Sequence, residues 1–117
     1  MSDVPRVDFP LDHFELIVLR VGDKADSLDA ETVRRLQAEH VGYLVELQRA
    51  GKLLAAGAVA PRTPAQTITG LGFFRLGSSS AVLELMAKDP SVVAGLDAAE
   101  VLQFVCPKGS LTFASVV

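Results

Sequence analysis

The order in which strand-like and helix-like segments follow one another constrains the fold of this chain more than any other feature. A helix is predicted from a cap at Ser27 or Asp29 to Gly51, because apolar residues recur there at helical spacing and glycine suits the position after a helix. A second helix is predicted from the serines at 78–80 to the residues before Pro90. Segments rich in branched and aromatic residues predict four strands, within residues 13–21, 52–59, 69–76 and 97–106.

This β-α-β-β-α-β order is the split arrangement of ferredoxin-like domains. We therefore predict an α+β fold in which two helices cover one face of a four-stranded antiparallel sheet. The first strand carries apolar residues on both faces: Phe14, Leu16 and Val18 alternate with Ile17, Leu19 and Val21. A sheet face in water would carry polar residues instead, so we predict a homodimer that stacks its uncovered sheet faces. The alternative is that the apolar tail, residues 107–117, folds back over this face.

The composition limits the classes of protein to be considered. A length of 117 residues suits a single domain over 1–117, with an irregular arm at 1–12 and the tail at 107–117. The net charge of −3 provides no cationic surface for nucleic acid. No apolar run approaches the roughly 20 residues that cross a bilayer, and the first residues do not resemble a signal peptide. With Cys106 as the single cysteine, no internal disulfide is possible, and we expect a cytoplasmic protein.

His40 is the most informative residue for function. It lies on the apolar stripe of the first predicted helix, four residues from both Leu36 and Leu44. A leucine there would pack equally well, yet the chain carries the side chain that exchanges protons near neutral pH. The alternative is a buried histidine that only hydrogen-bonds within the core.

Asp89 is the candidate partner of His40. A carboxylate at the C-terminal end of a helix is disfavoured by the helix dipole, and such breaks of a local rule gather at functional sites. The segment Asp89–Gly95 also has the pattern of a short helical turn, with aspartate as cap, proline first and glycine last. Both roles are compatible, because a capping carboxylate can still face a cleft.

A histidine and an aspartate that meet at one edge of the sheet suit proton transfer beside a carbonyl. The aspartate would orient the ring and stabilise the imidazolium, while the other ring nitrogen moves protons. This chemistry needs no metal or cofactor. The chain shows no serine or cysteine at a nucleophile elbow, so acyl transfer is not expected.

Other polar residues are weaker candidates. Arg20 and Arg75 lie in apolar strands, where each would either clamp a substrate carboxylate or form a salt bridge. His13 and Glu15 share a strand face, but two ligands do not make a metal site. Tyr43 is interpreted as a packing residue.

Two segments resemble the YciI-like (YCII-related) family, namely RRLQAEHVGYLVELQRAGKLLAAG and LMAKDPSVVAG. The resemblance runs from about Phe14 to Cys106, and the family is similar in fold to the dimeric α/β barrels that include muconolactone isomerases. It implies a ferredoxin-like dimer with an active-site histidine and aspartate, here His40 and Asp89. One group of this family removes chloride from chlorinated hydroxyquinols. The chain departs from the family pattern at Ser91, where an aromatic residue is common, and at Gly57-Ala58, where Gly-Pro is common.

Together, the residues and the resemblance predict a small cofactor-free enzyme that acts on a lactone, a hydroxyquinol or a similar carbonyl compound. His40 would be the general acid–base and Asp89 its partner. One alternative is a dimeric module that binds a small ligand without turnover. Another is a structural dimer in which His40 is a core residue.

Overall fold

The computed structural model describes residues 8–114. Residues 1–7 of the predicted arm and residues 115–117 of the predicted tail lie outside the described residues. The elements in chain order are β1 (Leu11–Val21), a short 3-10 helix (Ala25–Ser27), α1 (Ala30–Arg49), β2 (Leu53–Ala58), β3 (Ile68–Phe74), α2 (Ser79–Met86), α3 (Pro90–Val93) and β4 (Asp97–Pro107). The strands form one antiparallel sheet in the order β2-β3-β1-β4. The predicted α+β, ferredoxin-like architecture is confirmed.

Local signals set the ends of the helices. The side chain of Asp29 accepts a hydrogen bond from the Thr32 amide and begins α1, and Gly51 follows its end with a φ of 76°. Ser78 caps α2 in the same way. The second helix ends at Met86, earlier than the proline alone would require, and Pro90 then begins the separate helix α3.

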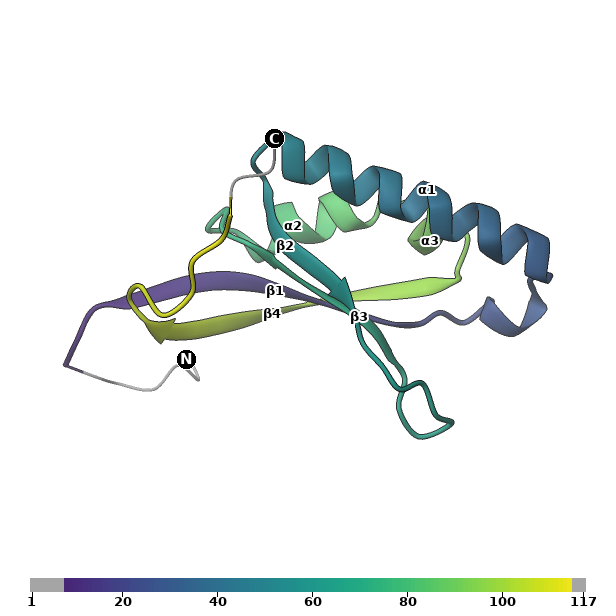
Figure 1. The fold of residues 1–117 in the computed structure, drawn as a ribbon, viewed down its shortest axis with the longest axis horizontal. Coiled ribbons are helices and arrows are strands. Elements are labelled where there is room, and N and C mark those ends of the chain that lie inside the picture. Colours follow the sequence, from purple (N-terminus) through teal and green to yellow (C-terminus); the bar gives the residue numbers. More distant parts are fainter. Residues whose placement is uncertain (1–7, 115–117) are drawn as a thin grey trace.

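The helices lie on one side of the sheet, with α1 running along the molecule above α2 and α3 (Figure 1). The core between the two layers comes from β1, β2 and β3 on the sheet and from the two longer helices. Its buried members are Ile17, Leu19, Leu47, Leu53, Phe74, Val82 and Met86. Among residues 8–114, no helix is long and apolar enough to span a bilayer.

The opposite face of the sheet is apolar, as predicted, and is only partly covered. Phe113 from the tail packs against Phe14 and Phe73, with ring centroids 5.6 Å and 5.8 Å apart. Farther along the same face, Leu71 and Leu102 remain 37% and 43% exposed. The tail therefore covers one end of this face, as the alternative predicted, and leaves the other end uncovered.

Candidate active site

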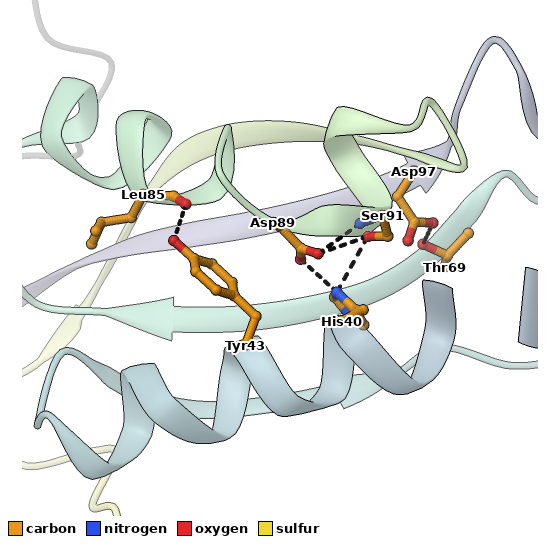
Figure 2. A network of polar contacts seen from close by, with 7 residues as sticks. All are labelled: His40, Tyr43, Thr69, Leu85, Asp89, Ser91 and Asp97. Atoms are coloured by element: carbon orange, nitrogen blue, oxygen red, sulfur yellow. Dashed lines mark hydrogen bonds and ion pairs between the residues drawn. The ribbon is translucent and has the colours of Figure 1, made fainter. Parts of the chain in front are cut away.

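The structure brings His40 and Asp89 together. His40 projects from α1 towards α3, and its Nδ1 lies 2.5 Å from Oδ2 of Asp89 (Figure 2). The Asp89 side chain is completely buried, whereas the His40 side chain retains 17% of its exposure. A short contact between a buried carboxylate and an imidazole has the geometry of a charge-assisted hydrogen bond.

The two roles considered for Asp89 are both present, each carried by a different oxygen. Oδ1 accepts the Ser91 amide at 3.0 Å, which is the cap of α3. Oδ2 faces His40. The cap holds the carboxylate in one orientation, so the turn that begins α3 also positions the partner of the histidine.

Ser91 is the third member of the group, and only an indirect sign of it is visible in the sequence. Its hydroxyl donates to Asp89 Oδ1 at 3.0 Å and lies 3.3 Å from His40 Nδ1, and the residue is fully buried. The departure of Ser91 from the aromatic residue common in the family was the signal that could have identified it. The small side chain of Ser91 leaves room for its hydroxyl to contact both Asp89 and His40.

Asp89 favours the protonated form of His40. The hydrogen bond with Asp89 raises the pKa of His40 above its ordinary value, burial opposes this, and the negative charges of Asp89 and Asp97 add to the increase. At neutral pH a larger fraction of His40 is therefore imidazolium than for a histidine in water. Nδ1 is occupied by Asp89, and no residue among 8–114 hydrogen-bonds to Nε2.

His40 borders a cavity of about 780 Å³ between α1 and the sheet. Its wall on α1 includes Val33, Gln37, His40, Leu44 and Gln48. The floor on β2 and β3 consists mainly of residues with little or no side chain, namely Ala56, Ala58, Gly70 and Gly72. Larger residues at these inward-facing positions would fill the space, so the small residues of the two strands create the cavity.

Tyr43 has a structural contact, in agreement with its interpretation as a packing residue. Its hydroxyl donates to the Leu85 carbonyl at 2.6 Å and so ties α1 to α2 (Figure 2). Burial raises the pKa of Tyr43. The contact fixes α1 one turn beyond His40.

The two arginines lie away from His40 and do not border the cavity. Arg20 pairs with Glu100 at 3.1 Å. Arg75 pairs with Asp12 and lies over the Phe14 ring, 5.0 Å from its centroid. The salt-bridge alternative thus describes their contacts.

The weaker candidates on β1 also have other partners. Glu15 is buried and accepts the amides of Leu76 and Gly77, and His13 lies 3.4 Å from Gln103. Residues 8–114 contain no group of three or more histidine, cysteine or acidic residues arranged to hold a metal ion.

Comparisons with known proteins identify the kind of domain. The family model described as YCII-related domain matches residues 16–105. No curated protein matches the chain. Among solved structures, the chain is similar to 5-chloro-2-hydroxyhydroquinone dehydrochlorinase (TftG) from Burkholderia phenoliruptrix AC1100, in complex with 2,5-dihydroxybenzoquinone. The identity is 20% over 78% of this chain and 90% of that one, with a TM-score of 0.49.

Proposed function

Because this chain belongs to the YCII-related domain family, we propose that it is a small enzyme that performs acid–base chemistry on a small molecule. His40 transfers the proton. Asp89 orients the imidazole ring and stabilises its protonated form. The observation that carries this proposal is a histidine with one nitrogen held at 2.5 Å by a buried carboxylate and its ring bordering a cavity of about 780 Å³. A histidine that served only to satisfy the core would not need an open cavity beside it.

The proposed reaction uses both protonation states of His40. As imidazolium, Nε2–H donates a proton to a carbonyl oxygen or to a leaving group, and as neutral imidazole Nε2 removes a proton from carbon. In an isomerisation, a proton leaves one carbon and another returns elsewhere on the substrate. In an elimination, a proton and a chloride ion leave together. Neither route requires a cofactor, since His40 can both accept and donate the transferred proton.

The lining of the cavity suits a small ring compound. Most of its lining residues are apolar, and the polar ones are Asp26, Gln37, His40, Gln48, Arg62, Thr69 and Asp97. An apolar cavity with a small number of placed polar groups is the usual form of a site for a small organic ligand. We therefore propose a lactone, a hydroxyquinol or a similar carbonyl compound as substrate.

The proposal is tested by proton exchange, because exchange beside a carbonyl can be detected whatever the complete reaction is. Butenolides, which are unsaturated lactones, and cyclic ketones are incubated with the protein in D₂O, and loss of the signal of the proton beside the carbonyl is followed by NMR. Chlorinated hydroxyquinols are tested in parallel for chloride release. Catalysed exchange or release supports the enzyme. Compounds that raise the melting temperature but are neither exchanged nor converted would instead favour the binding module.

The small residues of the cavity floor provide a prediction of their own. Ala56→Leu places three further carbons against the cavity, so we expect kcat/KM for an accepted substrate to fall by about tenfold or more. Ala55→Leu is the matched control, because Ala55 pairs with Phe73 and does not border this cavity. Equal activity of the Ala56→Leu variant and wild type would show that substrate does not enter this cavity.

We also propose that two copies pair through the uncovered end of the sheet. Leu71 and Leu102 are exposed there beside the partly buried Phe73 and Phe104, and water contact with such a patch is unfavourable. We expect Leu102→Lys to convert a dimer into a monomer in light scattering after gel filtration. Leu83→Lys, at an exposed leucine of α2, is the control. A monomeric wild type would contradict this proposal.

A further inference from the structure

One carboxylate of the cavity takes no part in the His40–Asp89 pair. Asp97 begins β4, lies opposite Val21 in the register of the sheet, and borders the cavity. Residues that lie opposite each other in an antiparallel pair share a face, so Asp97 is on the same side as Leu19, Ile17 and the helices. Its side chain is half-buried.

Thr69 holds this carboxylate in place. The Thr69 hydroxyl donates to Asp97 Oδ1 at 3.1 Å (Figure 2). The register of β1 with β3 shifts at this point, since Leu19 pairs with Gly70 and Arg20 with Ile68, which leaves Thr69 as an extra residue. Such a bulge turns neighbouring side chains to a new direction, and here both Thr69 and Gly70 border the cavity.

The contacts of Asp97 leave it able to bind a ligand. Only Oδ1 has a hydrogen-bond partner within residues 8–114, and Oδ2 has none. The charge of Asp97 also acts on His40, because it contributes to the raised pKa of the imidazole. The carboxylate and the imidazole are therefore close enough to influence each other electrostatically across the same cavity.

We propose that Asp97 is a substrate-binding residue whose carboxylate accepts a hydrogen bond from a hydroxyl group of an uncharged ring compound lying against His40. This deepens the function proposed above and rests on it. The hydroxyl donor satisfies the free oxygen of Asp97, and the apolar walls contact the ring. The cavity thus selects hydroxylated rings over their ethers, which have no proton to donate.

The charges around the cavity make a carboxylate ligand the main competing choice. Arg62, at the exposed loop between β2 and β3, is a cation on the cavity lining and would attract an anion. Asp26 and Asp97 would repel it. A solvent-exposed cation gains little from such a pair, whereas Asp97 is half-buried and held by Thr69. The balance favours the uncharged hydroxyl compound.

The test measures binding, not turnover. Resorcinol, its dimethyl ether and benzoate are titrated into the wild-type protein and each variant, and the Kd values are obtained from NMR chemical shifts. For wild type we expect resorcinol to bind about tenfold or more tightly than the ether, as a hydrogen bond to a charged group implies. Asp97→Asn is expected to weaken resorcinol binding by about tenfold or more. Asp26→Asn, an equal loss of charge at an exposed position of the same cavity, is expected to change it by less than about twofold.

Thr69→Val is the second variant, which keeps the carboxylate but removes the group that holds it. We expect it to weaken resorcinol binding by a smaller factor, and it carries the test if Asp97→Asn does not fold. Unchanged resorcinol binding in either folded variant, equal losses in Asp97→Asn and Asp26→Asn, or tighter binding of benzoate than of resorcinol by wild type would each overturn the inference. Selective resorcinol binding that depends on Asp97, without exchange or turnover of any substrate, would uphold the role of Asp97 while refuting the proposed enzyme.

Discussion

Replacing His40 with glutamine is expected to lower kcat for any substrate found in the exchange assay by about 10²- to 10⁴-fold. Glutamine approximates the size of the ring and can donate to Asp89, but it does not exchange protons near neutral pH. The fold should persist, because the buried carboxylate keeps a hydrogen-bond donor. The measurement is the rate of proton exchange or chloride release, together with circular dichroism to verify the fold.

The matched control for this prediction is Gln37→Asn, one turn earlier on α1 and also on the cavity lining. It alters the same wall without removing a titratable group, and we expect kcat to stay within about threefold. His40→Leu separates the remaining alternative. If His40 served only the core, the His40→Leu variant would keep any activity of the wild type. In the proposed enzyme this substitution abolishes turnover. It also leaves the Asp89 carboxylate buried without its partner, which destabilises the fold.

Replacing Asp89 with asparagine is expected to lower the pKa of His40. The hydrogen bond with Asp89 and the negative charge of Asp89 are the main causes of the raised pKa. In the variant both are lost, and burial then favours the neutral ring. Asparagine is also a good helix cap, so α3 should remain. We expect kcat near neutral pH to fall by about tenfold or more, since less imidazolium is present and the ring is less well oriented. NMR titration of the His40 ring measures the pKa directly.

The same variant should change how stability depends on pH. In wild type the pKa of His40 is raised in the folded state above its ordinary value of 6.5. The pair therefore contributes its full stabilisation below about pH 6.5 and loses it as the pH rises through the folded-state pKa. Urea unfolding should show wild type losing its advantage over Asp89→Asn across this window. A difference that grows with rising pH would contradict the assigned protonation state.

A matched control for both measurements is Ser91→Ala. It removes the hydroxyl that contacts Asp89 and His40 but keeps the carboxylate. Its cost should be about 1 kcal/mol in unfolding free energy, and the pKa of His40 should remain above its ordinary value. If the pKa of the His40 ring in the Asp89→Asn variant equalled that in wild type, Asp89 would not control the protonation of this ring.

The order of elements and the ends of the helices were predictable from local patterns. Asp29, Gly51 and Ser78 act within a few residues of their own positions, so their roles follow from neighbouring sequence. The cap at Asp89 was predictable for the same reason. The approach of Asp89 to His40 was expected from the face of the helix and the family resemblance, and the structure brings the two side chains together.

The remaining members of the site were not predictable because their contacts join distant segments. Ser91 contacts His40 only because α3 lies against α1 in the folded chain. Asp97 and Thr69 meet across the end of β1, where a bulge in β3 shifts the register of β3 with β1. The partners of Arg20 and Arg75 were hidden in the sequence for the same reason. Each arginine pairs with a carboxylate on a neighbouring strand that is distant in the chain.

Local sequence patterns were sufficient to predict which segments become strands and helices and which residue carries a titratable ring on an inward helix face. Those properties depend on periodicity and on capping groups a few residues apart. Three features became visible only in the folded chain: small residues on two strands leave a cavity under α1, a second carboxylate borders it, and Phe113 covers one end of the opposite sheet face. These features depend on register and on packing between segments far apart in the chain, which no local pattern encodes.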